Sequence, residues 1–150
     1  MPAYTTSFLF PDVNVWVALT HGQHAHHLIA NDWFTSLDEH VRLCFCRFTQ
    51  LSLLRLLTAE AVMSEEVLSQ SEAWTVYDRW LTDDRVELVE EPSGVERRFR
   101  ALTRGRHAAP KTWADAYLIA FADAAQLTLV TFDRGLHNKA QSLILLEESE

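Results

Sequence analysis

The chain has 150 residues, of which 48% are hydrophobic, a size that allows one buried core and argues against two independent domains. No window reaches the ~18 uninterrupted apolar residues of a membrane span, and the start of the chain lacks the charged and apolar regions of a signal peptide, so we expect a cytosolic protein. The formal net charge of −8 argues against a protein that coats nucleic acid by bulk attraction.

The first half of the chain predicts strands that alternate with helices. Phe8–Phe10 is a short apolar run, and Val13–Leu19 predicts a helix soon after it. From Ala25, apolar residues recur at helical spacing over about four turns. Leu43–Cys46 is the next buried strand. The apolar helix that follows, which Thr49 is placed to cap, should lie deep in the core.

The second half continues this alternation. Ser64 and the two glutamates after it predict the start of a helix, because acids in the first turn complement the helix dipole. Ser93–Glu96 matches the capping-box pattern, so the arginine-rich segment should begin as a helix and break at Gly105. The remaining elements are strands at Val86–Val89, Leu127–Thr131 and Leu143–Leu146, an alanine-rich helix at Thr112–Ala125, and a turn at Asp133–Gly135.

Short, continuously apolar strands between helices are typical of a mainly parallel sheet with helices on both faces. We therefore predict a single α/β domain over residues 1–150. In such sheets, ligands bind beyond the carboxyl ends of the strands, where the strand order reverses. Asp12 and Asp133 each follow a predicted strand, and Asp115 lies in the first turn of the helix before the Leu127–Thr131 strand. The three carboxylates can therefore meet at one edge.

Three carboxylates at one edge predict a metal site. Unpaired carboxylates repel one another and raise one another's pKa, so such a cluster is stable mainly when a cation neutralises it. Carboxylate oxygens suit Mg²⁺ or Mn²⁺, and Mg²⁺ combines a few carboxylates with waters and phosphate oxygens, as in phosphodiester hydrolysis. Each aspartate alone would be interpreted as a turn former or helix cap, and the combination favours metal-dependent hydrolysis.

The basic residues are unevenly distributed. Six of the 13 lie between residues 97 and 113 without an acid among them, so all 21 acidic residues lie elsewhere. They are Arg97, Arg98, Arg100, Arg104, Arg106 and Lys111. Because they shortly precede Asp115, we expect them to hold an RNA backbone over the acidic edge.

Three segments resemble the PIN-domain nucleases, and in particular the VapC toxins of bacterial toxin–antitoxin pairs. Phe10–Leu19, with Asp-Val-Asn-Val at its centre, resembles the family's opening strand, whose aspartate is a metal ligand. Thr112–Ala120 resembles the late helix start that carries the second ligand, and Leu129–Leu136 resembles the closing strand and turn with a third acid. The resemblance spans almost the whole chain and implies a PIN-like fold with Asp12, Asp115 and Asp133 as metal ligands.

One position departs from the family pattern. The family usually has Thr-Glu at the start of its second long helix, whereas this chain has Thr49-Gln50. Gln50 offers a carbonyl oxygen without negative charge, so we expect it to assist the aspartates and expect one firmly held metal rather than two. The alternative is that Gln50 is only a polar residue of the first helical turn. Asn14, Thr49 and Thr131 are expected to orient the ligands or bound water.

Other features favour structural interpretations. Cys44 and Cys46 lie in an apolar run and are expected to be small buried hydrophobes in a reducing compartment. The histidines between His21 and His27 are expected in a solvent-exposed loop and helix start, with RNA contact or metal binding as alternatives. Asn14 stands where phosphotransferases of the haloacid dehalogenase type need a second aspartate, which argues against that class. Trp113 is kept as a candidate RNA or partner contact.

The leading hypothesis is thus a Mg²⁺- or Mn²⁺-dependent endoribonuclease of the VapC type. The resemblance further implies a cognate antitoxin, whose peptide would lie across the active-site groove, and a homodimer. A second hypothesis, motivated by Gln50, is a catalytically weak PIN-like module that binds RNA or a protein. A third is a nuclease directed at DNA, because the same metal cluster can hydrolyse either backbone.

Overall fold

A computed structural model describes residues 7–147, in which five strands alternate with helices. The strands are β1 (Ser7–Pro11), β2 (Val41–Phe45), β3 (Val86–Leu88), β4 (Thr128–Thr131) and β5 (Leu143–Leu145). The helices are α1 (Val13–Thr20), α2 (His27–Thr35), α3 (Arg47–Leu57), α4 (Glu60–Met63), α5 (Gln70–Leu81), α6 (Val95–Leu102) and α7 (Thr112–Ala125), with 3-10 helices at Ser64–Glu66 and Arg134–Leu136. Residues 1–6 and 148–150, which the predicted domain and the expectation about a signal peptide include, lie outside the described residues.

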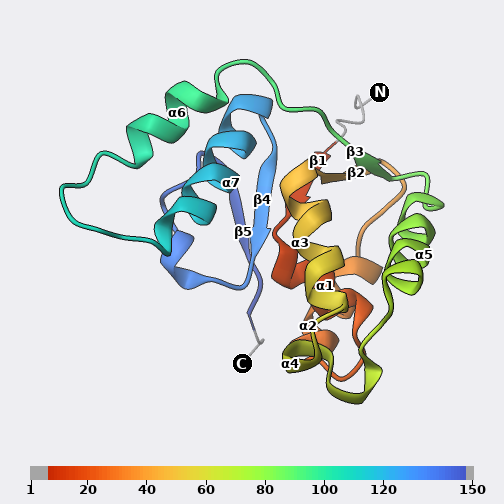
Figure 1. Cartoon of the computed structure of the whole chain (residues 1–150). Coiled ribbons are helices and arrows are strands. Elements are labelled where there is room, and N and C mark those ends of the chain that lie inside the picture. The colour runs from red at the N-terminus through yellow and green to blue at the C-terminus, as the bar shows by residue number, and fades with distance from the viewer. Residues whose placement is uncertain (1–6, 148–150) are drawn as a thin grey trace, which may run out of the picture.

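The five strands form one sheet with the order β3-β2-β1-β4-β5, and every pairing in the described part is parallel. The chain builds outward from β1 to β3 and then returns to the other side of β1 to form β4 and β5 (Figure 1). The predicted parallel sheet is confirmed, and its strand order reverses between β1 and β4. That point is where open α/β sheets bind ligands.

Helices cover both faces of the sheet, as predicted. In Figure 1, α6 and α7 lie on one side, and α1, α3 and α5 lie on the other. Neighbouring strand residues alternate between the two cores: Leu9 packs with Trp16 under α1 and α3, whereas Phe10 packs with Phe121 under α7. The second core also contains Cys44 and Cys46, which are free and buried, as the sequence indicated. Within residues 7–147, no helix has the length and apolar character needed to cross a membrane.

The starts of three helices differ from the predictions. Cys46, and not Thr49, is the N-cap of α3; the Thr49 hydroxyl accepts a hydrogen bond from the Cys46 N–H at 2.9 Å and so secures the same turn. The helix predicted from Ser64 is only a 3-10 helix that ends at Glu66; α5 begins after Ser69, whose hydroxyl and the Glu72 carboxylate form a reciprocal capping box. The capping box predicted at Ser93 is also wrong, because α6 begins after Gly94 at a φ of 94° without a side-chain cap.

Two helix lengths also differ. The helix predicted from Ala25 spans only nine residues, from His27 to Thr35, rather than about four turns. Helix α6 ends at Leu102, before the predicted break at Gly105.

Helix α3 is amphipathic rather than deeply buried. Leu53 and Leu57 are fully buried, but Leu51 is 61% exposed. The run of leucines therefore gives only one core-facing stripe, and the expectation that the whole helix lies deep in the core is wrong.

This stripe gives a matched pair of variants. Leu53→Ala should lower the free energy of unfolding by about 2–5 kcal/mol, because it removes buried methyl groups and leaves a cavity. Leu51→Ala, on the exposed face of the same helix, should change it by less than about 0.5 kcal/mol. Urea denaturation of both variants measures the difference, and equal losses would contradict the described burial of α3.

Candidate active site

Asp12 lies where the strand order reverses, between the carboxyl ends of β1 and β4. Its backbone N–H donates to the Val130 carbonyl at 2.9 Å, which continues the β1–β4 pairing by one residue. One carboxylate oxygen, Oδ1, accepts from the Val15 N–H at 3.2 Å, so Asp12 is the N-cap of α1. The other, Oδ2, accepts from the Thr131 hydroxyl at the end of β4. Both strands and the helix therefore fix this side chain, which is only 6% exposed.

Burial raises the pKa of Asp12 above its ordinary value, and the nearby charge of Asp115 raises it further. The hydrogen bond from Thr131 is the strongest effect in the opposite direction, followed by the backbone N–H groups of Val15 and Asn14. The site thus keeps a buried carboxylate whose ionised form depends on the Thr131 hydroxyl and the helix start.

Asp115 and Asp133 reach the same region from other elements. Asp115 is half-buried in the first turn of α7, and its pKa is raised by burial and by the charge of Asp133, while Lys139 acts in the opposite direction. Asp133 is exposed; its Oδ1 accepts from the Gly135 N–H at 2.8 Å, and its own N–H donates to Thr131 Oγ1 at 3.0 Å. Thr131 therefore links Asp12 to the Asp133 turn.

The fold brings the predicted acids together in pairs, Asp12 with Asp115 and Asp115 with Asp133. In the part of the chain that the structure describes, none of the three forms an ion pair, and no group of three metal-ligating side chains is close enough to hold an ion by itself. Like charges with raised pKa and hard oxygen donors fit a divalent cation that completes its coordination with water and phosphate oxygens.

The residues expected to assist the three aspartates, Gln50, Thr49 and Asn14, have different surroundings. Gln50 is buried, its Oε1 accepts from Arg47 Nη1 at 2.6 Å, and its amide also hydrogen-bonds the Tyr77 hydroxyl. Its carbonyl oxygen is thus already engaged by a cation. Thr49 is buried and bonded to Cys46, as described above, whereas Asn14 is exposed and contributes its backbone N–H to Asp12.

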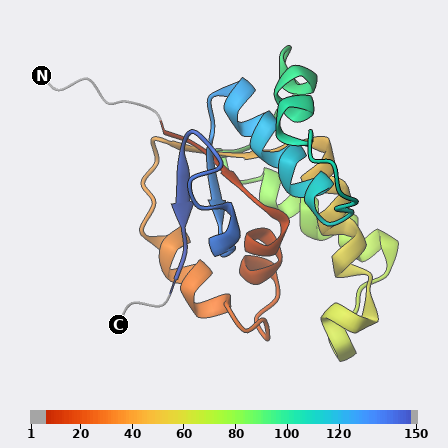
Figure 2. The ribbon, with the colours of Figure 1, turned by 90° about the vertical axis from the view of Figure 1, so that its left-hand side faces the viewer.

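The six predicted basic residues fall into two groups. Arg98 Nε lies 3.0 Å from Oδ2 of Asp123, whose side chain is only 3% exposed, so this arginine fastens α6 to α7. Arg100 forms an exposed pair with Glu96 one turn away, at 3.3 Å. The others are exposed and form no ion pair with the described residues: Arg97, Arg104, Arg106 and Lys111. Arg104, Arg106 and Lys111 lie in the segment between α6 and α7, which extends outward from the two helices in Figure 1 and overlaps α7 in the view of Figure 2.

A cavity of about 450 Å³ opens beside Asp115, and we call it the Asp115 cavity. Its lining residues come from α7, from the α6–α7 segment and from the turn after β4, and include Thr103, His107, Trp113, Asp115, Ile119 and Lys139. Lys139 was not predicted from the sequence, because it lies in a turn without any motif, and only the fold brings it to Asp115.

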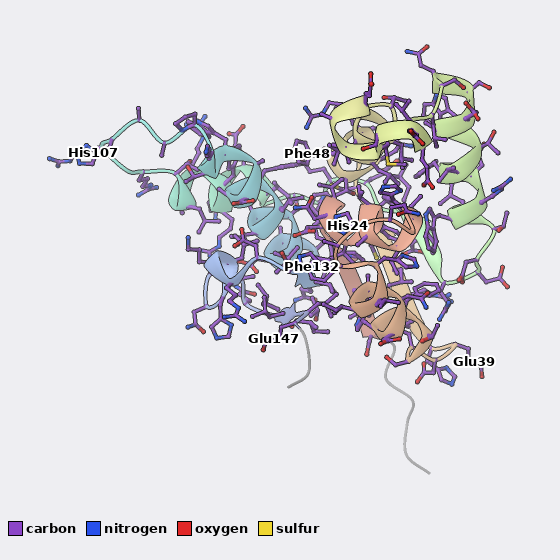
Figure 3. The ribbon with its side chains drawn as sticks, turned by 90° about the horizontal axis from the view of Figure 1, so that it is seen from below. His24, Glu39, Phe48, His107, Phe132 and Glu147 are labelled. Carbon is purple, nitrogen blue, oxygen red and sulfur yellow. The ribbon has the colours of Figure 1, made fainter. Side chains whose placement is uncertain are left out.

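Aromatic side chains lie along the carboxyl edge of the sheet. Seen from below in Figure 3, Phe48 and Phe132 lie between α7 and the α1–α3 side, whereas His107 lies far out on the α6–α7 segment. The Phe132 ring stacks with His26 at 4.6 Å between centroids. The expectation that this histidine segment is solvent-exposed is wrong for His21, which is buried, with Nδ1 3.1 Å from Glu66 Oε2.

The sequence and the fold of this chain are similar to those of known proteins. Residues 9–141 match the family model described as the PIN domain. Ribonuclease VapC41 from Mycobacterium tuberculosis (strain H37Rv) is 42% identical over 129 residues, which cover 83% of this chain and 88% of that protein. The crystal structure of VapBC2 from Rickettsia felis, bound to a DNA fragment from the promoter, has a TM-score of 0.66 at 12% identity and covers 93% of this chain and 99% of that chain. A toxin–antitoxin complex from Klebsiella pneumoniae has a TM-score of 0.60 at 11% identity, with coverage of 94% and 99%.

The role of Thr131 can be tested with an isosteric change. Thr131→Val should raise the pKa of Asp12 further, because valine keeps the volume but removes the hydrogen bond that most strongly stabilises the carboxylate. Thr128→Val is the matched control, since the Thr128 hydroxyl on the same strand contacts Ser142 instead. Carbon NMR of the Asp12 carboxyl measures the titration in metal-free protein, and an unchanged midpoint in Thr131→Val would contradict the assignment.

Proposed function

The chain belongs to the PIN-domain family, and we propose that it is a metal-dependent endoribonuclease, the toxin of a VapBC-type toxin–antitoxin pair. The 42% identity to a ribonuclease over most of both chains supports this function. Within the chain, the observation that carries the proposal is the pair of buried or half-buried carboxylates, Asp12 and Asp115, that interact unfavourably at the point of strand reversal.

We propose that Asp12 and Asp115 hold Mg²⁺ or Mn²⁺ and that Asp133 contributes directly or through water. Such a cation, when bound, supplies Lewis acidity toward a water molecule and toward the phosphodiester. The residues of the chain provide its binding and orientation. Thr131 keeps the Asp12 carboxylate in one position and ties the Asp133 turn to it.

Gln50 should assist without adding charge. Its carbonyl oxygen accepts from Arg47, so its contribution to a metal is smaller than that of the glutamate usual in the family. We propose that the isolated chain holds one metal firmly and that an RNA phosphate supplies the negative charge that Gln50 lacks.

The exposed basic residues should bind the RNA backbone. Arg97, Arg104, Arg106 and Lys111 are available for phosphates, with Arg100 beside them, whereas Arg98 serves to hold α6 against α7. A cognate antitoxin across the groove is proposed from the similarity in fold to a toxin–antitoxin complex. A homodimer and a cytoplasmic location stay predictions.

Gln50 also motivates a second candidate, a catalytically weak module that binds RNA or a protein. Undiminished RNA binding without any cleavage would favour it. Comparing single-stranded RNA with single-stranded DNA under the same conditions separates a ribonuclease from a nuclease directed at DNA.

Cleavage should depend on the metal-holding acids. Asp12→Asn and Asp115→Asn should each lower the rate of RNA cleavage by at least about a hundredfold, because a metal site contributes several kcal/mol to transition-state stabilisation. Asp78→Asn, an exposed acid of α5, is the matched control and should cleave normally. The assay follows a labelled single-stranded RNA with Mg²⁺ or Mn²⁺ and with EDTA. Cleavage that persists in EDTA or in the Asp12→Asn protein would rule out the proposed mechanism.

The two groups of arginines should respond differently to substitution. Arg104→Gln should weaken RNA binding and reduce the slope of log K against log salt by about 0.7, the value for one phosphate contact on a single strand. Arg98→Met should instead lower the free energy of unfolding by about 1–3 kcal/mol, because the Asp123 carboxylate loses its cation. Salt-dependent fluorescence anisotropy and urea denaturation give the two results, and a reversed pattern would contradict this division.

A further inference from the structure

Trp113 is an exposed aromatic residue next to the acids. It lies in the first turn of α7, two residues before Asp115, and is 55% exposed. Its ring contacts Phe99 of α6 edge-on, at 5.9 Å and 84°. Phe99 thus supports the ring, and more than half of the side chain is left to solvent. Fixed aromatic surfaces of this kind are the ones on which unpaired nucleobases stack.

Two hollows meet at Trp113. On one side is the Asp115 cavity, which Lys139 also lines. On the other side is a hollow of about 510 Å³ lined by Glu96, Phe99, Arg100, Thr103, Arg104 and Trp113, which we call the arginine hollow. Trp113 therefore stands between the half-buried acid of the proposed metal site and two of the arginines.

The chemistry of the two hollows fits a nucleotide strand better than a peptide. Arg104 and Lys139 offer positive charge for phosphates, whereas Arg100 is paired with Glu96, the acid of the arginine hollow. An acidic peptide could satisfy these charges as well. The aromatic face favours a nucleotide, because every base has a flat face to stack on it while its phosphates reach cations on both sides.

We propose that Trp113 is the stacking site for an unpaired base adjacent to the scissile phosphate, and that the RNA runs from Asp115 across Trp113 into the arginine hollow. This inference rests on the proposed ribonuclease function, because it takes the cleaved phosphate to lie at Asp115. It adds the path of the strand and requires the substrate to be single-stranded at this position.

The test uses a fluorescein-labelled single-stranded RNA of mixed sequence in EDTA, so that binding is measured without cleavage. Trp113→Ala should weaken binding about tenfold, since stacking of one base contributes about 1–3 kcal/mol and 1.4 kcal/mol corresponds to a factor of ten. Trp113→Phe should restore most of the affinity. Trp74→Ala removes a similarly exposed tryptophan, on α5, and should bind like the wild type.

An RNA with abasic residues separates stacking from structural damage. The wild-type protein should bind abasic RNA more weakly than normal RNA, whereas Trp113→Ala should bind the two RNAs with equal affinity. The inference is overturned if Trp113→Ala binds normal RNA within twofold of the wild type, or if the substitution lowers the affinity for normal and for abasic RNA by the same factor. Unchanged RNA binding would point to a protein contact at this surface. Wild-type protein that neither binds nor cleaves RNA would overturn the proposed function itself, whereas normal Mg²⁺-dependent cleavage by Trp113→Ala with unchanged binding would overturn only the role of Trp113.

Discussion

The contact between β1 and β4 at Asp12 is the constraint on which the site depends. Its backbone N–H completes the pairing with Val130, and its side chain is held by the Thr131 hydroxyl and the first turn of α1. β1 is the central strand, and the sheet extends from it first to β2 and β3 and later to β4 and β5, so the strand order reverses at this contact. Asp115 therefore approaches Asp12, and Asp133 approaches Asp115, from elements that are distant in sequence.

This arrangement costs stability in the metal-free chain. The pKa of Asp12 and that of Asp115 are raised by burial and by neighbouring acids, so folding disfavours their ionised forms. Below the pKa of an unfolded aspartate, about 3.9, both states are protonated and the cost is absent. It grows as the pH rises through that value and is complete above the folded pKa. A bound cation would offset it, because it interacts with the ionised form alone.

The sequence allowed the strands to be predicted within one or two residues, because most of them contain a short apolar run of the kind that a sheet covered on both faces requires. The helix starts were harder to predict from the sequence. Ser64 and Ser69 are each followed by glutamate within three residues, and only the reciprocal hydrogen bonds between Ser69 and Glu72 make Ser69 the start of α5. The three acids were identified by their positions after strands and at a helix start. The Arg47–Gln50 bond joins residues three apart on α3, whereas the approach of Lys139 to Asp115 depends on long-range packing, which no local pattern contains.

The division among the basic residues follows from the same packing. Arg98 lies where α6 crosses α7, and the Asp123 side chain opposite it is buried and also accepts from the Gln141 N–H, so that pair fixes α6 in place. With α6 fixed, Phe99 supports Trp113, and Arg100 and Arg104 line the hollow beside it. One partly buried ion pair, Arg98 with Asp123, thus helps to position the exposed arginines relative to Asp115. A net charge of −8 is therefore compatible with RNA binding, because six of the 13 basic residues are concentrated on α6 and on the segment that joins it to α7.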